Sequence, residues 1–323
     1  MRTSRWTIIA GWMVSMLSVV VMAQSYPTKP VKIIVPAGPG GPDIVARIVA
    51  AKFTQQMGQT FFVENHGGAN GIVGADMVAK AAPDGYTLMV YSSGIVINQF
   101  VNKKLPYDTT NDFVPITKLI DNTGVFITVN PALPVKTVLE LVDLARNPAS
   151  KLAYSTPGIG NTLHIATEMF NAKYGTHMVH IPYKGGGLAA AAAISGEVQV
   201  MFNSPSNVVQ NARSGKLRVL AFSGTKRSEA LPEVPTTAEA GVPEYVFDGG
   251  WFAMFAPART APELVDRLYR EYRAVLADKG ASDKIRALGV DPVGDTPAEF
   301  RKFYLAEIGR YAEWVKLAKI QPE

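Results

Sequence analysis

The stretch Val31-Lys-Ile-Ile-Val-Pro-Ala-Gly-Pro-Gly-Gly-Pro-Asp43 decides the fold class, because a hydrophobic run, a glycine-rich turn and a helical pattern follow one another there. Residues 31–35 have the length and composition of a buried strand. Residues 43–57 have the pattern of a helix. A strand that turns directly into a helix is the first part of a βαβ unit, so the sequence predicts further strands parallel to this one.

The same alternation of strand and helix continues along the chain and restarts after residue 125. Further strands are predicted at 60–64, 87–91, 125–129, 152–155, 178–181, 198–202, 217–222 and 251–255. Helices are predicted at 71–82, 135–146, 161–173, 188–194, 207–213, 262–277, 281–288 and 297–319. This pattern predicts an α/β protein in two lobes, each a mostly parallel sheet flanked by helices, with a cleft between them.

The first residues of the chain have the three parts of a secretory signal peptide. Arg2 and Arg5 precede an apolar run at 6–22, and Val21-Met22-Ala23 ends it with a small-residue cleavage pattern. The alternative is a transmembrane anchor, but a run of about 17 residues is at the short limit for spanning a membrane. We therefore expect cleavage near Ala23 and a location in the periplasm.

Charge and composition exclude several classes of protein. The 323 residues contain no cysteine, which excludes disulfides, thiol nucleophiles and cysteine-ligated metal centres. The formal net charge is +5; removal of residues 1–23 lowers Lys+Arg from 32 to 30 and leaves Asp+Glu at 27, so the mature chain carries about +3. So small an excess, spread along the chain, does not indicate a nucleic-acid surface, but it suits a small anionic ligand.

No arrangement of side chains in the sequence indicates catalysis or metal binding. His177 and His180 are three residues apart in a predicted strand, a spacing that points them to opposite faces and disfavours a shared metal ion. His164 is predicted to pack or cap near a helix start. Neither Gly-x-Ser-x-Gly nor His-Glu-x-x-His occurs. We expect a protein that is not an enzyme and takes no cofactor or metal; a secreted enzyme acting on an organic acid is the alternative.

Three glycine-containing loops follow predicted strands, at the end of the strand where open α/β sheets bind their ligands. In the loop 36–43, Gly38 and Gly40 match the first two glycines of a dinucleotide-binding motif, but Asp43 replaces the third and would repel a pyrophosphate. Two interpretations stay open. Asp43 caps the following helix, or the loop offers backbone N–H groups to a carboxylate or an amide.

The other two loops are also candidate anion sites. In the loop 155–162, Asn161 or Thr162 suits the N-cap of a helix, whose free N–H groups attract an anion without a lysine. In the loop 183–187, Lys184 precedes three glycines, the reverse of a phosphate-binding loop. Lys184 either attracts an anion to the rim of the cleft or is an ordinary solvated lysine.

Ordered stretches through the whole mature chain resemble one family. Two of them read Ala79-Lys-Ala-Ala-Pro-Asp-Gly-Tyr-Thr-Leu88 and Ile181-Pro-Tyr-Lys-Gly-Gly-Gly187, and the others are residues 26–36, 40–47, 63–65, 71–74, 215–221, 231–236 and 287–294. Together with the signal peptide, they resemble the Bug-type, TctC-like extracytoplasmic solute-binding receptors of tripartite tricarboxylate transporters. This resemblance implies the two-lobed periplasmic binding protein fold, which closes around its ligand.

The resemblance further implies a division of the chain and a function. Residues 24–124 and 249–323 would form the first lobe, and residues 125–248 the second. The protein would be a monomer that captures a di- or tricarboxylate, an amino acid or an aromatic acid and delivers it to the membrane subunits of the transporter. The alternative is a sensor partner that presents the same ligand to a signalling protein.

The resemblance also carries ligand-binding residues onto this chain, all of them in or beside loops that follow strands. They are Ala37, Gly38, Gly40, Gly41, Asp43, Ser92, Ser93, Ser155, Gly160, Asn161, Thr162, Tyr183, Lys184, Gly185 and Asn203. The family often has aspartate where Asn203 stands, which puts amino acids as ligands in doubt. It also often has glycine where Arg259 stands, and we expect no functional effect of that change.

The two tryptophans of the mature chain are predicted to differ in their response to lobe closure. Trp251 follows Asp248-Gly-Gly250, where the chain should cross back between lobes, and glycines absorb hinge motions at low cost. Trp251 is therefore predicted to be the main fluorescent reporter of closure. Trp314, on the C-terminal helix, is predicted to be remote from the cleft.

Overall fold

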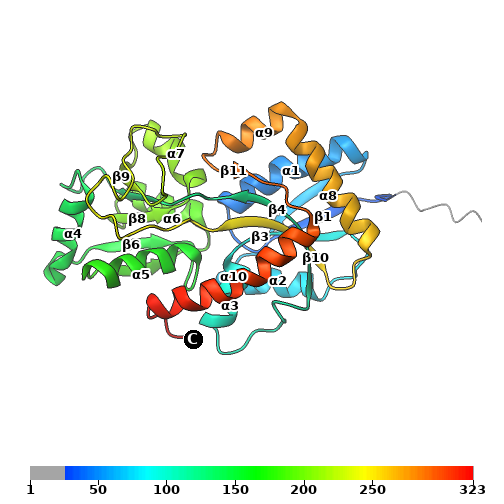
Figure 1. The fold of residues 1–323 in the computed structure, drawn as a ribbon, viewed down its shortest axis with the longest axis horizontal. Helices are drawn as coiled ribbons and strands as arrows, with labels where there is room; N and C mark the ends of the chain where they lie inside the picture. The colour runs from blue at the N-terminus through cyan, green and yellow to red at the C-terminus, as the bar shows by residue number, and fades with distance from the viewer. Residues whose placement is uncertain (1–25, 323) are drawn as a thin grey trace, which may run out of the picture.

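The computed structural model describes residues 26–322. The predicted signal peptide at 1–23 therefore lies outside the described residues. Within 26–322, no helix combines the length and apolar character needed to cross a membrane. Figure 1 shows two lobes side by side, each a sheet with helices on its faces, so the predicted two-lobed α/β architecture is confirmed.

The first lobe contains a six-stranded sheet in the order β11-β4-β10-β3-β1-β2. Its strands are β1 (Val31–Val35), β2 (Phe61–Asn65), β3 (Thr87–Ser92), β4 (Phe113–Asp121), β10 (Trp251–Pro257) and β11 (Asp291–Pro292). One face packs on α1 (Gly41–Met57), α8 (Pro262–Ala277) and α9 (Lys279–Arg286). The other face packs on α2 (Ile72–Ala79), α3 (Gly94–Val101) and α10 (Pro297–Leu317).

The second lobe contains a five-stranded sheet in the order β7-β6-β8-β5-β9. Its strands are β5 (Phe126–Val129), β6 (Ala153–Thr156), β7 (Val179–Pro182), β8 (Val200–Asn203) and β9 (Arg218–Phe222). Helices α6 (Gly186–Ser195) and α7 (Pro205–Arg213) pack on one face, and α4 (Val138–Arg146) and α5 (Thr162–Tyr174) on the other. Two short 3₁₀ turns, η1 (Ala69–Gly71) and η2 (Pro148–Ser150), complete the described elements.

Both sheets are mixed, which corrects the prediction of mostly parallel sheets. Strand β1 pairs parallel with β2 and β3, and β6 pairs parallel with β7 and β8. In contrast, β10 is antiparallel to β3 and β4, and β5 is antiparallel to β8 and β9. The reason is the double crossing between lobes. The chain leaves the first lobe after β4 and returns along β10, so these two strands run in opposite directions.

Besides the two 3₁₀ turns, three elements were not predicted from the sequence: β4, β11 and α3. Pro115 lies inside β4 and cannot donate to the sheet, so the segment does not have the pattern of a strand. The sheet accommodates it because the register of β4 with β10 shifts between Met254 and Phe255, beside Pro115. On its other edge, β4 pairs with β11 only at residues 120 and 121. Pro115 therefore does not have to donate a hydrogen bond to β11.

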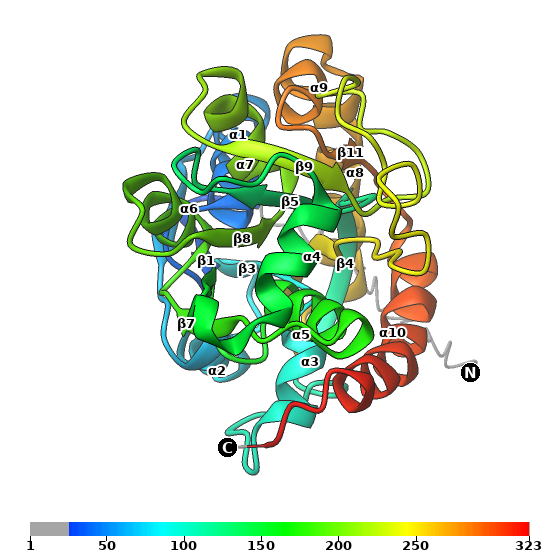
Figure 2. The ribbon, with the colours of Figure 1, turned by 90° about the vertical axis from the view of Figure 1, so that its left-hand side faces the viewer.

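The strands divide between the lobes at residues 122–125 and again between 222 and 251. This membership is the basis on which we propose the division into residues 24–124 with 249–323 and residues 125–248. Helix α10 extends along both lobes (Figure 1) and lies beside α5 and α3 in the end view of Figure 2; it packs on α3 and β4 of the first lobe and on α5 of the second. It therefore lies across the two crossings of the chain.

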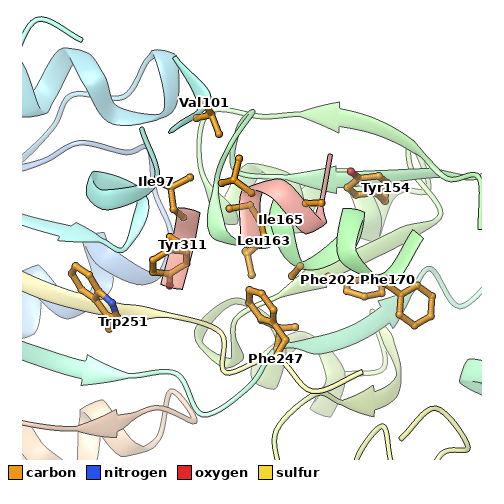
Figure 3. Packing of buried hydrophobic residues seen from close by; sticks show 14 of the residues in the cluster. Ile97, Val101, Tyr154, Leu163, Ile165, Phe170, Phe202, Phe247, Trp251 and Tyr311 are labelled. Atoms are coloured by element: carbon orange, nitrogen blue, oxygen red, sulfur yellow. The ribbon is translucent and has the colours of Figure 1, made fainter. Parts of the chain in front are cut away.

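One hydrophobic cluster continues from the first lobe into the second. Figure 3 shows Ile165 and Leu163 of α5 between Val101 of α3 on one side and Phe247, from the segment between β9 and β10, on the other, with Tyr311 of α10 beside Leu163. All these side chains are buried. The lobes are thus packed on each other behind the cleft, and relative motion has to occur about the two crossings.

Candidate ligand-binding site

A cavity of about 310 Å³ lies between the two lobes. The first lobe contributes residues 36–38, 41–42, 67–71, 91–93, 101–102 and 122. The second lobe contributes residues 157–159, 161–163, 182–186, 204 and 207, and the crossover and β10 contribute Gly249 and Phe252. The first-lobe loops after β1 and β3 and the second-lobe loops after β6 and β7 thus meet here, as the rule for carboxyl ends of strands predicts.

The loop after β1 begins α1 earlier than the sequence suggested. Gly40 is the N-cap residue and no side chain caps the helix. Asp43 is the third helical residue, and its Oδ1 accepts a hydrogen bond of 2.9 Å from Nε of Arg47, one turn later. The interpretation of Asp43 as the cap is therefore wrong. Its carboxylate faces Arg47 and does not line the cavity.

The two glycine-rich loops of opposite lobes touch backbone to backbone at the mouth of the cavity. The N–H of Gly187 donates a 3.0 Å hydrogen bond to the carbonyl of Pro39. A Cβ atom on Gly38 would lie 2.0 Å from the carbonyl oxygen of Lys184, and one on Gly187 would lie 2.9 Å from the carbonyl of Pro39. We call residues 38–41 and 184–187 the glycine contact. It holds the lobes closed over the cavity, and only glycine permits so close an approach.

A polar bridge joins the lobes deeper in the cavity. The hydroxyls of Ser93, at the start of α3, and Thr162, at the start of α5, are 2.7 Å apart and both residues are buried. A Cβ atom on Gly250 would approach both side chains, at 2.5 Å from Oγ of Ser93 and 3.1 Å from Cγ2 of Thr162. The hinge glycine, the end of β3 and the start of α5 therefore meet at one point beside the cavity.

The residues of the loop 155–162 point in different directions, and only some of them face the cavity. Asn161 is the N-cap of α5, and its Oδ1 accepts from the N–H of Leu163, so that prediction is confirmed. Gly160 has a positive φ of 68°, and its Cβ would lie 2.3 Å from Val101 of the first lobe, so it faces α3 instead of the cavity. The hydroxyl of Ser155 donates to the carbonyl of Ala189, beneath α6.

The loop 183–187 contributes mainly its backbone. Lys184 is exposed, and its carbonyl oxygen faces Gly38. The hydroxyl of Tyr183 donates to the carboxylate of Glu197 at 2.7 Å. Asn203 is fully buried. Its side-chain N–H donates to the carbonyl of Gly186, and its Oδ1 accepts from the side chain of Asn207. Asn203 therefore links the starts of α6 and α7.

The structure thus brings together part of the predicted set. Those that line the cavity are Ala37, Gly38, Gly41, Ser92, Ser93, Asn161, Thr162, Tyr183, Lys184 and Gly185. Those that do not are Gly40, Asp43, Ser155, Gly160 and Asn203. For all of them, contact with a ligand remains a prediction.

Several polar lining residues were missed from the sequence. They are Asn70, Asn102, Asn122, Ser204 and Asn207. Asn102 and Asn122 follow α3 and β4, two elements that the sequence did not reveal. Ser204 and Asn207 could have been found, because they follow the predicted strand 198–202 at its carboxyl end.

Two histidines stack behind the loop 155–162. The rings of His164 and His180 are 3.9 Å apart between centroids, and Nδ1 of His164 accepts from the N–H of Gly160 at 3.0 Å. Nε2 of His180 lies 2.5 Å from the hydroxyl of Thr156. Burial, together with the neighbouring His180, lowers the pKa of His164 to about 3, and burial lowers the pKa of His180 to about 4. Both rings are therefore neutral at pH 7.

This pair predicts a loss of stability in acid. The unfolded chain takes up protons on its histidines below about pH 6.5, whereas the folded protein takes them up only near pH 3–4. The free energy of unfolding should therefore fall as the pH drops from 6.5 towards 4, by up to about 1.4 kcal/mol per pH unit for each histidine. Urea unfolding at several pH values should show a shallower fall in the His164→Gln/His180→Gln double variant. The exposed His177→Gln variant is the control; if it matches the double variant, the stacked pair is not the cause.

Comparison with known proteins gives one consistent family. A model described as the tripartite tricarboxylate transporter family receptor, TctC, matches residues 45–318. Protein BugT of Bordetella pertussis is 36% identical over 92% of this chain and 91% of its own.

Three solved structures have the same fold. A periplasmic transporter has 35% identity and a TM-score of 0.87, covering 92% of this chain and 99% of its own. The R. palustris protein Rpa4515 with adipate has 32% identity and a TM-score of 0.88, and the match covers 92% of this chain and 100% of its own. MatC from Rhodopseudomonas palustris with bound malate has 27% identity and a TM-score of 0.83, and the match covers 90% of this chain and 100% of its own.

Proposed function

We propose a function from the premise that this chain belongs to the receptor family of tripartite tricarboxylate transporters: it captures a small carboxylate between its two lobes and delivers it to the membrane subunits of such a transporter. The observation that carries this proposal is the cavity between the lobes, closed by the glycine contact and lined by neutral residues and the exposed Lys184. Related structures hold adipate and malate, which are carboxylates of a size suited to such a cavity.

The neutral lining suits an anion for a physical reason. Backbone N–H groups and hydroxyls can bond a carboxylate and replace its water without adding a second buried charge. Ser92, Ser93 and Thr162 gather at the starts of α3 and α5, where two helices also direct their N-terminal dipoles. We place the carboxylate of the ligand at this end of the cavity.

A panel of organic acids tests the proposal on the mature protein. A ligand at a hundred times its dissociation constant should stabilise the fold by about 2.7 kcal/mol, which appears as a rise in the melting temperature. The panel includes succinate, malate, adipate, citrate and benzoate, with glucose as the uncharged control. If glucose raised the melting temperature and none of the acids did, the proposal that the ligand is a carboxylate would be wrong.

We propose binding without turnover, in the periplasm, by a monomer. The relatives are receptors and periplasmic proteins. Prolonged incubation with the acid found by screening should return it unchanged, and light scattering should give the mass of one chain. The intact mass of the exported protein should correspond to a first residue Gln24, whereas retention of residues 1–23 would contradict cleavage at Ala23.

Lobe closure should change the fluorescence of Trp314 more than that of Trp251. Trp251 packs within the first lobe, on Phe300 and Tyr304 of α10, and its Nε1 donates to Glu307 at 2.8 Å. Trp314 instead lies 4.6 Å from Phe247, between ring centroids, and Phe247 is bonded to Ser223 at the end of β9. The contact of Trp314 therefore spans the hinge, although Trp314 does not line the cavity.

This geometry reverses the sequence-based choice of Trp251 as the main reporter. Titration with the bound acid should give a signal that persists in Trp251→Phe and disappears in Trp314→Phe. A fluorescence change that survives in Trp314→Phe and is lost in Trp251→Phe would show that the surroundings of Trp251 on β10, and not those of Trp314, change on closure.

A further inference from the structure

The charges around the cavity restrict the ligand beyond the proposed function. None of the described residues that line it is an aspartate or a glutamate. The only lysine or arginine among them is Lys184, which is exposed. Asp43 and Asp248, in neighbouring segments, are paired with Arg47 and Arg310 and do not line the cavity. An ammonium group bound there would lose its water without gaining an anionic partner, which is unfavourable.

One side chain of the cavity wall has an unused hydrogen-bonding group. Asn122 follows β4, lines the cavity and is only 2% exposed. Its N–H is fixed by the carbonyl of Gly250 at 2.9 Å. Its side-chain Oδ1 has no hydrogen-bond partner among residues 26–322. A buried amide oxygen without a hydrogen-bond donor is costly, so its presence beside a binding cavity points to a donor group that the ligand supplies.

The sheet register places this amide next to other lining residues. Ile120 of β4 is opposite Phe252 of β10, and Phe252 is opposite Ser92 of β3. Side chains that are directly opposite in neighbouring strands share one face of the sheet. Asn122 comes two residues after Ile120 and therefore continues this face, on which Phe252 and Ser92 line the cavity.

We propose that the ligand is a carboxylate that carries a neutral hydroxyl group and no ammonium group, and that Asn122 binds this hydroxyl. The unpartnered Oδ1 of Asn122 is a hydrogen-bond acceptor, so it can accept a hydrogen bond from a hydroxyl of the ligand. It supplies no negative charge for an ammonium group. The inference rests on the proposed function, because it assumes that the carboxylate is bound in this cavity.

Matched acids on one carbon skeleton test the inference by calorimetry. The series are succinate, malate and aspartate; glutarate, 2-hydroxyglutarate and glutamate; and phenylpropionate, phenyllactate and phenylalanine. In each series that binds, the hydroxy acid should bind about 5- to 10-fold more tightly than the unsubstituted acid, the size of one neutral hydrogen bond. The amino acid should bind at least 100-fold more weakly than the hydroxy acid.

The outcomes separate this inference from the proposed function. An amino acid that binds as tightly as its hydroxy acid overturns the inference and leaves the proposed function standing. The same holds if adipate or benzoate binds and no hydroxy acid does. If no carboxylate binds at all, the proposed function itself fails, and the inference fails with it.

Substitutions at Asn122 test its role directly. Asn122→Asp keeps the size of the side chain and adds a negative charge. It should therefore lower the affinity for hydroxy acids at least 10-fold, and the difference in affinity between hydroxy acids and amino acids should become smaller or change sign. Asn122→Ala should abolish the preference for the hydroxy acid over the unsubstituted acid. Asn147→Asp is the charge control: Asn147 is exposed and caps a 3₁₀ turn through its Oδ1, which aspartate retains. A preference that is unchanged in Asn122→Ala would exclude Asn122 as the contact, even if Asn122→Asp did not fold.

Discussion

Gly38→Ala should reduce ligand affinity at least 100-fold while the protein remains folded. Gly38 has no positive φ, so alanine fits its backbone. In the closed protein, however, the new Cβ would lie 2.0 Å from the carbonyl oxygen of Lys184. The loops would have to separate by more than 1 Å to reach a normal contact distance, and the hydrogen bond between Gly187 and Pro39 would be lost. A 100-fold loss corresponds to about 2.7 kcal/mol of closing energy.

The matched control is Gly309→Ala. Gly309 lies in α10 with nothing within 4 Å of its would-be Cβ, so the same chemical change should leave affinity unaltered. Calorimetry measures the affinity, and thermal unfolding without ligand shows whether each variant is intact. Wild-type affinity in Gly38→Ala would mean that the glycine contact is not needed for binding.

The ion-pair network at the hinge should be the most sensitive place for stability. Glu307 of α10 is only 4% exposed, accepts from Nε1 of Trp251 and pairs with Arg310. Arg310 also pairs with Asp248 of the crossover segment. Burial raises the pKa of Glu307, although the charge of Arg310 opposes that shift. Arg310→Leu would leave a buried carboxylate without its cation, which should cost about 3 kcal/mol of unfolding free energy.

The sign of the pH dependence distinguishes this cause from lost packing. Without Arg310, the pKa of Glu307 rises further, so the folded protein binds more protons than the unfolded chain. The destabilisation should therefore be largest at neutral pH and shrink as the pH falls, because a protonated Glu307 needs no cation. Arg310→Leu/Glu307→Gln should recover part of the loss.

Urea unfolding of these variants provides the measurement. The control is Arg267→Leu, which breaks a surface pair between the exposed Arg267 and the half-buried Glu271 one turn away on α8 and should cost less than about 1 kcal/mol. An equal loss in Arg310→Leu and Arg267→Leu, or no recovery in the double variant, would show that the buried charge is not what Arg310 compensates.

The sequence predicts much of this fold, because the strands and helices that it reveals alternate with clear turns. The strand 31–35 and the helix 262–277 have the predicted bounds. Strand β4 escapes detection because Pro115 interrupts its pattern, and a bulge in the pairing with β10 compensates for the proline only in three dimensions. The antiparallel pairing of β5 and β10 follows from the crossing between lobes, which no local pattern encodes.

The candidate site is predictable at the level of loops but not of every residue. Loops at the carboxyl ends of strands line the cavity, as the general rule requires. Gly160 and Asp43 lie in segments that the sequence assigns to these loops. Gly160 nevertheless faces Val101, and Asp43, which is already in helix α1, faces Arg47. Gly38 and Lys184 meet across 146 positions of sequence, so the close approach that requires glycine is visible only in the folded chain.

Small-angle X-ray scattering of the mature protein, with and without the carboxylate selected by the acid panel, tests most directly that the two lobes close on a carboxylate. The account predicts that saturating acid lowers the radius of gyration of the wild type and of Gly309→Ala, and leaves that of Gly38→Ala unchanged. A wild-type radius of gyration that does not change, under conditions where calorimetry shows the site to be full, would contradict capture by closure of the lobes.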